Sequence, residues 1–145
     1  MNRADADLIA RRTLAHYQQA IDSMSRQKLA ALFAEDAVLH RANAPIEGRE
    51  AILEFYKPFF PVVGHMRHFL SSILAEPDGD LVRSECIFWY IHVRADEVVL
   101  GWGDYRHTIR PTGDGDGEII EKHITVHHSQ AVPMEVADAL RPGSV

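Results

Sequence analysis

The second half of the sequence carries four long strand-like segments separated by turn residues, and this pattern limits the possible folds more than any other feature. Apolar, β-branched and aromatic residues, which favour strands, dominate the segments. Pro77-Asp78-Gly79, Asp96 and the Gly113–Gly117 stretch interrupt them with residues typical of tight turns. Because strands joined by short turns pair antiparallel, we expect a meander. The predicted strands span about 66–76, 80–94, 97–110 and 118–129.

Helical spacing dominates the residues before the meander. Leu14, Tyr17 and Ile21 recur at steps of three and four, which predicts an amphipathic helix over about 5–24. Ser25 can cap a second, shorter helix, because its hydroxyl can accept a hydrogen bond from a backbone N–H of the first turn. The two helices therefore form a hairpin with almost no loop.

A short strand and a third helix complete the first half of the chain. A turn at Glu35-Asp36 is expected to end the second helix, and 37–40 then forms a short apolar strand. From Arg49 helical spacing returns, until Pro58 and Pro61 end it because proline lacks the backbone donor. This order of elements predicts an α+β domain, with helices packed on one face of a curved sheet.

Length, composition and charge indicate one globular domain and exclude some partners. The chain has 145 residues, 46% of them apolar and 25% charged. We assign 1–131 to the domain and 132–145 to a C-terminal tail. Lys and Arg number 15 against 21 Asp and Glu, so the net charge is -6 and nucleic acid is not an expected partner.

Cysteine usage and hydropathy indicate a cytoplasmic protein. Cys86 is the single cysteine and cannot close an intrachain disulfide, which fits a reducing compartment. No apolar run approaches the roughly 20 residues that span a bilayer, and the first residues lack a signal-peptide core. We therefore expect no contact with a membrane.

One aspartate and one histidine are candidates for acid–base chemistry. Asp22 lies near the C-terminal end of the first predicted helix, where the helix dipole disfavours a carboxylate unless it has a partner. His68 opens the strand after the third helix. A carboxylate bonded to one imidazole nitrogen fixes the tautomer and leaves the other nitrogen for proton transfer. A second interpretation is open: Asp22 caps local amides and His68 is a core residue.

The nine histidines do not show the spacing of a metal site. An ion needs three or four converging ligands, and no predicted helix offers two histidines one turn apart on one face. His123 and His127 share a strand face but lie about 13 Å apart along it. The glycines at 113, 115 and 117 precede a strand, whereas a phosphate-binding loop precedes a helix. We therefore expect no metal and no other cofactor.

Five segments of the chain form a pattern known from one protein family. They are Tyr17…Asp22, Leu29–Val38, Ile46–Ile52, Arg67-His68-Phe69 and Asp78–Val82. Together they resemble the SnoaL-like branch of the NTF2-like superfamily over roughly residues 8 to 129. The resemblance implies a cone in which a strongly bent sheet and three helices enclose a pocket, and it implies pairing as a dimer.

The resemblance also implies roles for particular residues. Scytalone dehydratase and the bile acid 7α-dehydratases place a carboxylate at the end of the first helix and a histidine on the strand after the third, and Asp22 and His68 match these positions. Tyr17 matches a tyrosine of the bile acid enzymes, and His92 aligns with a second pocket histidine of scytalone dehydratase. The β subunits of ring-hydroxylating dioxygenases resemble the same pattern without being catalytic.

Aromatic residues are the candidates for the wall of this pocket. They are Phe55, Tyr56 and Phe59 on the third helix, and Tyr90, His92 and Trp102 on the strands. Strand alternation does not tell which face points inward, and any one of these residues could instead belong to the core or to a dimer surface. Together they indicate a mainly apolar ligand that a few hydrogen bonds orient.

These expectations combine into a leading function and an alternative. The leading function is a cofactor-independent dehydratase, isomerase or cyclase acting on a polycyclic, aromatic or steroid-like carbonyl compound. His68 would be the base and acid, Asp22 its orienting partner, and Tyr17 a hydrogen-bond donor to the substrate oxygen. The alternative is a non-catalytic binding protein or a partner of a dioxygenase α subunit. We also expect a homodimer, because the strand around 87–91 is apolar on both faces.

Overall fold

The computed structural model describes residues 1–60 and 64–135, which form three α-helices against one six-stranded sheet. The α+β class expected from the sequence is confirmed. The helical elements are α1 (Arg3–Asp22), α2 (Arg26–Leu32), α3 (Arg49–Tyr56) and a 3-10 turn, η1 (Lys57–Phe59). The strands are β1 (Phe33–His40), β2 (Ile46–Glu47), β3 (His65–Asp78), β4 (Leu81–Val93), β5 (Glu97–Gly113) and β6 (Asp116–Pro133).

The first two helices form the expected hairpin. The side chain of Asn2 caps α1 by accepting a hydrogen bond from the backbone N–H of Asp5 at 2.9 Å. Ser25 caps α2 in the same way, with its Oγ 3.3 Å from the backbone nitrogen of Lys28. Between the helices, Met24 takes a positive φ of 52°, which turns the chain within a few residues.

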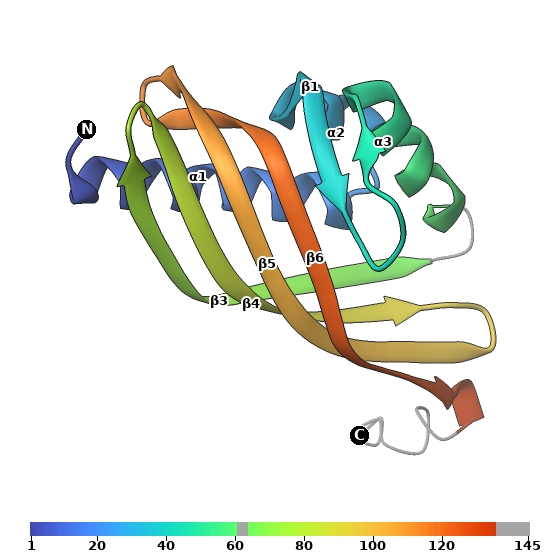
Figure 1. Cartoon of the computed structure of the whole chain (residues 1–145). Coiled ribbons are helices and arrows are strands. Elements are labelled where there is room, and N and C mark those ends of the chain that lie inside the picture. Colours follow the sequence, from blue (N-terminus) through green and yellow to red (C-terminus); the bar gives the residue numbers. More distant parts are fainter. Residues whose placement is uncertain (61–63, 136–145) are drawn as a thin grey trace.

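The strands of the sheet are arranged in the order β2-β1-β6-β5-β4-β3. β3 to β6 form the predicted antiparallel meander, with short turns between successive strands. β1 pairs in parallel with β6, and β2 closes the edge beside β1. Figure 1 shows α1 behind the sheet, with α3 beside the β1 edge. β1, the first strand of the domain, is therefore hydrogen-bonded to β6, the last one.

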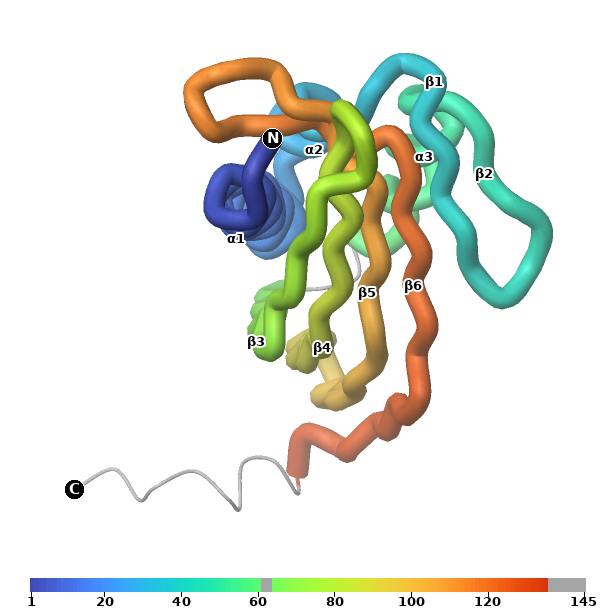
Figure 2. The backbone as a smooth tube through the Cα atoms, turned by 60° about the vertical axis from the view of Figure 1, so that its left-hand side comes forward, coloured from blue at the N-terminus to red at the C-terminus, as the bar shows by residue number. Residues whose placement is uncertain are grey.

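The sheet is bent, and its inner face is covered by α1. In β3 the register against β4 shifts between Ser71 and Leu74, and Ser72 has a φ of 53°. Such a bulge bends the strand and increases its twist. Figure 2 views α1 nearly end-on beside the inner face of the strands. Tyr17 of α1 packs edge-on against Tyr105 of β5, and Phe88 of β4 stacks on Tyr105 with ring centres 3.9 Å apart.

Two predicted boundaries were wrong. β1 begins at Phe33 rather than at 37, so Glu35-Asp36 lies inside the strand instead of forming a turn. At the other end, β6 continues to Pro133, because its last residues still pair with β5. The strand thus runs into the segment assigned to a tail, and residues 136–145 of that tail lie outside the described residues.

The outer face of the sheet exposes large apolar side chains. Trp89 of β4 is 55% exposed, and its cross-strand neighbours Phe69 and Trp102 are exposed as well. Other exposed members of this face are Leu74, Ile87, Ile91 and Leu100. We call this set the outer apolar face.

None of the helices in the described part of the chain is long and apolar enough to cross a membrane.

Candidate active site

Asp22 and His68 form a buried pair on the inner side of the sheet. Oδ1 of Asp22 lies 2.8 Å from Nδ1 of His68, and the side chains are 11% and 8% exposed. The backbone N–H of His68 also donates to both carboxylate oxygens, at 3.0 and 3.2 Å. Asp22 is the last residue of α1, so these donors compensate a carboxylate that the helix dipole disfavours. The structure thus brings together the two residues predicted as a dyad.

This geometry defines the proton positions on the imidazole. A carboxylate only accepts hydrogen bonds, so Nδ1 of His68 carries a proton and donates it to Asp22. In the neutral ring Nε2 then bears the lone pair, and among the described residues it has no hydrogen-bond partner. A histidine held in this way can accept a proton at Nε2 and return it, while Asp22 stabilises the imidazolium.

Two further predicted residues, Tyr90 and His92, lie beside His68. The ring of His92 lies 5.6 Å from that of His68, and the ring of Tyr90 lies 4.7 Å from that of His92. Burial, together with the nearby charges of His68 and Arg94, lowers the pKa of His92 from 6.5 to about 4. Its Nε2 is buried and has no hydrogen-bond partner among the described residues. A neutral histidine with an unpaired buried nitrogen therefore lies beside His68.

The position of Tyr90 depends on a glycine and a serine that the sequence did not single out. The Tyr90 hydroxyl donates to Oγ of Ser129 at 2.7 Å. Gly101 is the cross-strand partner of Tyr90, and a Cβ at this position would overlap the Tyr90 ring. Gly101 therefore gives the tyrosine room to lie against the sheet. A glycine within a strand is a signal of such close approach, although it does not name the partner.

Tyr17 lies deeper in the core than its predicted role implies. Its side chain is 1% exposed, and its hydroxyl is 3.0 Å from the hydroxyl of Tyr56 on α3. Burial raises the pKa of both tyrosines well above 10, so both remain protonated donors. The two hydroxyls hold two protons and use one in their mutual bond. The Tyr105 hydroxyl is a further hydrogen-bonding neighbour of Tyr17, so donation by this pair to a substrate stays a prediction.

The remaining predicted wall residues divide between the two faces of the sheet. Phe55 and Phe59 are half-buried around α3 and η1, with ring centres 5.6 Å apart. Trp102 lies on the outer face beside Trp89, whereas His68 lies on the inner face. Trp102 therefore does not line a pocket at His68, and its assignment there is corrected. The error arose because strand alternation alone does not define which face points inward.

A buried lysine is the main polar residue that sequence reasoning missed. Lys122 of β6 is 0% exposed, and its Nζ lies 2.8 Å from Nε2 of His107. The same nitrogen lies 3.3 Å from the centre of the Tyr105 ring and 4.1 Å from that of Tyr17. Burial holds the pKa values of Lys122 and His107 well below their usual values. A neutral amine donating to a neutral imidazole fits this arrangement.

Two hollows are lined by described residues, and both lie away from the dyad. One has a volume of about 350 Å³, and its lining includes Arg83, Arg106 and His123. The other, of about 270 Å³, is lined by residues that include His40 and His123. Neither lining includes His68 or the aromatic residues of α3. The apolar pocket beside the dyad therefore stays a prediction.

Comparison with known proteins identifies the family. The SnoaL-like domain matches residues 3–118 of this chain. The chain belongs to the SnoaL-like family, and its fold is NTF2-like, which confirms the resemblance found in the sequence. No protein with a curated description matches the chain.

Solved structures with the same fold include proteins of several activities. A Novosphingobium aromaticivorans DSM 12444 protein named "Putative Scytalone Dehydratase" is 20% identical, with a TM-score of 0.76 and coverage of 84% of each chain. One from N. aromaticivorans named "putative aromatic ring hydroxylase" is 19% identical, with a TM-score of 0.79 over 92% of this chain and 96% of that one. Hexachlorocyclohexane dehydrochlorinase LinA-type3 from Novosphingobium barchaimii LL02 is 14% identical, with a TM-score of 0.71 over 83% and 85%. At these identities the likeness concerns the fold.

Proposed function

We propose that this protein is a cofactor-independent lyase or isomerase in which His68 transfers a proton to and from a hydrophobic carbonyl substrate. The observation that carries the proposal is the buried bond between Asp22 and Nδ1 of His68, at 2.8 Å. It fixes one tautomer and leaves Nε2 to react. The proposed substrate class rests on the predicted pocket beside the dyad, whose aromatic wall would suit polycyclic, aromatic or steroid-like compounds.

The proposed reaction begins with removal of a proton from the carbon next to the carbonyl. Nε2 of His68 takes this proton, and Asp22 balances the charge that develops on the ring. The electron pair moves to the substrate oxygen, where a protonated tyrosine of the Tyr17–Tyr56 pair is the proposed donor. In a dehydration the imidazolium then returns the proton to the departing hydroxyl group, and water leaves.

Two enzymes with the same fold are named for related eliminations. A dehydratase removes water and a dehydrochlorinase removes hydrogen chloride, and each needs a base for a proton on carbon. These names describe the other proteins. They support an elimination here because this chain supplies a histidine oriented for that step.

The test is solvent exchange at carbon, which does not require the natural leaving group to be known. Aromatic and alicyclic ketones of the tetralone and steroid type are incubated with the protein in D₂O, and loss of the proton signal next to the carbonyl is followed by NMR. We expect exchange with at least one ketone. His68→Ala should reduce its rate by about 10²–10⁴-fold, the usual contribution of a general base. Asp22→Asn should also slow it, because the tautomer is no longer fixed.

The outer face supplies a matched control. His127 and Asp104 form a second histidine–aspartate pair, 2.6 Å apart but exposed by 38% and 50%. His127→Ala should leave the exchange rate unchanged. The proposal is wrong if exchange persists in His68→Ala or if no ketone of the panel exchanges. Thermal melting of each variant separates loss of catalysis from loss of the fold.

A second candidate function, a non-catalytic partner protein, is favoured by a different observation. The outer apolar face exposes Trp89 and Phe69 by more than half of their surface. Exposed aromatic residues gathered on one sheet face are typical of an interaction surface. A second copy of this chain is the occupant we propose. A dioxygenase α subunit is the alternative, which co-purification with such a subunit would support.

A further inference from the structure

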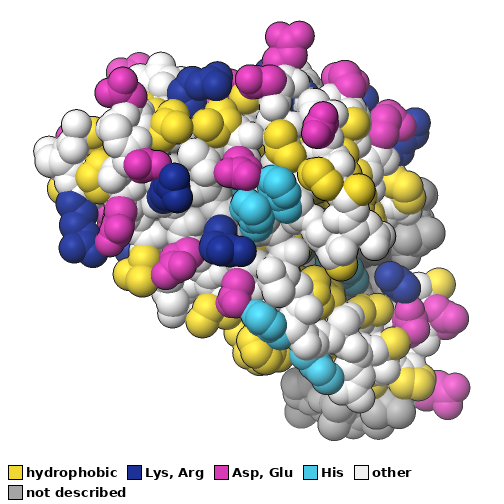
Figure 3. All heavy atoms as spheres, in the orientation of Figure 1, with side chains coloured by type: hydrophobic (Ala, Val, Ile, Leu, Met, Phe, Trp, Pro, Cys, Tyr) yellow, Lys and Arg dark blue, Asp and Glu magenta, His cyan; other side chains and the backbone are white. Residues whose placement is uncertain are grey.

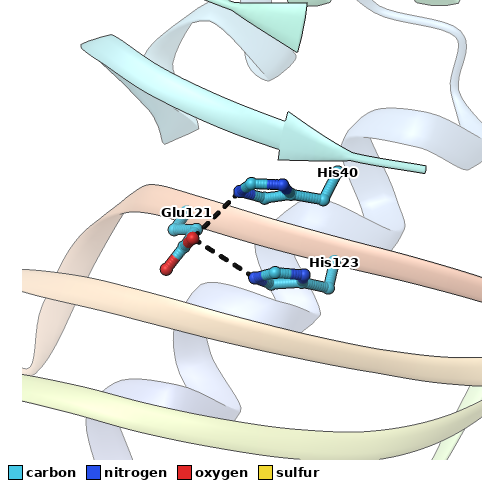
Figure 4. A group of neighbouring side chains, drawn as sticks. All are labelled: His40, Glu121 and His123. Carbon is cyan, nitrogen blue, oxygen red and sulfur yellow. Dashed lines mark hydrogen bonds and ion pairs between the residues drawn. The ribbon is translucent and has the colours of Figure 1, made fainter. Parts of the chain in front are cut away.

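We propose that His40, Glu121 and His123 form a binding site for a divalent transition-metal ion of the zinc class. The site lies on the outer face of the sheet, where β1 meets β6, and it is separate from the dyad. The inference does not depend on the proposed function. We refer to these three residues as the outer triad, and Figure 4 shows both imidazoles directed at Glu121.

The backbone pairing of the sheet brings the outer triad together. His40 and His123 are direct partners across the parallel β1–β6 pair, so their side chains emerge on the same face. Glu121 lies two residues before His123 on β6 and therefore shares that face. All three residues stand on paired strands, which hold ligands more precisely than loops do.

The ligand atoms have the separations that a single ion requires. Nε2 of His40 lies 2.9 Å from Oε1 of Glu121, and Nε2 of His123 lies 3.3 Å from the same oxygen. All three atoms lie within 4.8 Å of one another. A tetrahedral zinc ion with bonds of about 2.0–2.1 Å separates its ligand atoms by roughly 3.3 Å. The spacing therefore matches, in contrast to the pair of His123 and His127.

The carboxylate is prepared to act as a ligand. Glu121 accepts hydrogen bonds from His40 and Thr108, and Nε2 of His123 lies 3.3 Å from Oε1 of the same carboxylate. Oγ1 of Thr108 donates to Oε2 at 3.3 Å, which leaves Oε1 directed at the two histidines. Such an outer contact orients a metal ligand.

Access and donor type determine the kind of ion. The side chains of the outer triad are 33%, 41% and 34% exposed for His40, Glu121 and His123, so an ion can reach them from solvent. Two imidazoles and one carboxylate suit zinc, cobalt, nickel or copper better than calcium or magnesium. Three protein ligands leave one position of a tetrahedral ion open. A hollow of about 350 Å³ lies beside it, with Glu121 and His123 in its lining.

Binding requires one local movement. The rings of His40 and His123 stack with centres 4.1 Å apart and planes 5° from parallel. Parallel rings direct their Nε2 lone pairs side by side, so the rings must tilt toward each other to share an ion. Figure 3 shows histidine side chains at the surface on this face of the molecule, and the side chains of His40 and His123 are only partly buried. The ion would also replace the protons that now bridge to Glu121.

The test is direct titration of the full chain, prepared without a polyhistidine tag, with Zn²⁺. We expect one equivalent to bind, and cobalt in its place to give a visible d–d absorption band. His40→Ala, His123→Ala and Glu121→Gln should each weaken binding by about tenfold or more. Thr108→Val, which removes only the orienting hydrogen bond, should weaken it less. Zn²⁺ should raise the melting temperature of the wild type but not that of the triad variants.

His127→Ala is the matched control for this test as well. It removes a histidine from the same strand that is bonded to a carboxylate but has no second histidine at ligand distance among the described residues. Its affinity for Zn²⁺ should equal that of the wild type. A wild type that binds no stoichiometric Zn²⁺ overturns the proposal, as does binding that survives in His40→Ala and His123→Ala. Melting curves without metal show whether each variant is folded.

Discussion

Replacing Lys122 with methionine is expected to remove a pH dependence from the stability of this protein. The amine is fully buried, and no carboxylate among the described residues pairs with it. Burial therefore holds its pKa well below 10.5 in the folded protein. In the unfolded chain the same amine keeps its ordinary pKa and is protonated at neutral pH. Folding must release this proton.

The size of the effect follows from proton linkage. Between the folded and unfolded pKa values of Lys122, the unfolded state binds one more proton than the folded state. The free energy of unfolding then rises with pH by about 1.4 kcal/mol per unit and falls as the pH is lowered. Methionine does not titrate. Between pH 7 and 9 the wild type should gain up to roughly 2.7 kcal/mol relative to Lys122→Met, or about 5–10 °C in melting temperature.

A competing interaction could keep the amine charged. Nζ of Lys122 lies over the rings of Tyr105 and Tyr17, a position that also suits an ammonium ion. A desolvated cation–π contact contributes about 2 kcal/mol, whereas burying an ammonium ion without a counter-ion costs several kcal/mol. The desolvation cost is larger, so we expect the neutral amine.

Urea unfolding at pH 7, 8 and 9 measures the difference between the two proteins. Fluorescence of Trp89 and Trp102 reports unfolding, and equal protein concentrations keep any effect of association constant. Groups common to both proteins and distant from Lys122 largely cancel. Cys86 lies close enough to Lys122 to be affected, but burial raises its pKa to about 11, above the pH range of the measurement. Methionine also removes the hydrogen-bond donor to His107. This loss changes the free energy of unfolding by the same amount at all three pH values. A difference that stays constant across this range would show that Lys122 is charged in the folded protein and would refute the reasoning.

Three further predictions concern other parts of the molecule. Trp89→Glu should convert a dimer into a monomer by charging the outer apolar face, and sedimentation velocity that finds the wild type monomeric at micromolar concentration would contradict the proposed dimer. Gly101→Ala should displace the Tyr90 ring and destabilise the fold by about 1–3 kcal/mol, while Gly64→Ala, where a Cβ meets only ordinary contacts, should not. His92→Gln should make urea stability less sensitive to acid. The folded pKa of His92 is depressed to about 4, so its stabilising contribution is present above pH 6.5 and is lost as the pH falls toward 4; equal acid sensitivity of the two proteins would contradict this.

Local sequence signals predicted most of the fold because helices and hairpins depend on near neighbours. The spacing of Leu14, Tyr17 and Ile21 predicted α1, and Pro77-Asp78-Gly79 predicted the turn after β3. The start of β1 was missed because it depends on a residue far away in the sequence. Phe33 continues the apolar spacing of α2, but its pairing with Ile119 of β6 places it in the sheet. Sequence spacing carries no direct sign of such a distant partner.

The same distinction applies to the sites. Asp22 could be singled out because a carboxylate at a helix C-terminus is unfavourable without a partner. His68 was proposed as that partner from its place at the start of the strand after the third helix, and the resemblance supported the pairing. The outer triad could not be predicted, because His40 meets His123 only through the register of β1 against β6. The search for metal ligands by spacing within one element therefore overlooked it. Lys122 was missed because an isolated lysine on a strand is far more often exposed.

The parallel pairing of β1 with β6 also sets the order in which the domain can be completed as it is synthesised. β1 is made early, yet its main partner strand begins only at Asp116. Contacts between such distant segments close a long loop and form slowly. Until β6 is made, one edge of β1 is unpaired and open to other strands. A nascent chain that stops before Ile119 therefore lacks the strand that joins the N-terminal part to the meander, and emergence of β6 is the event that closes the sheet.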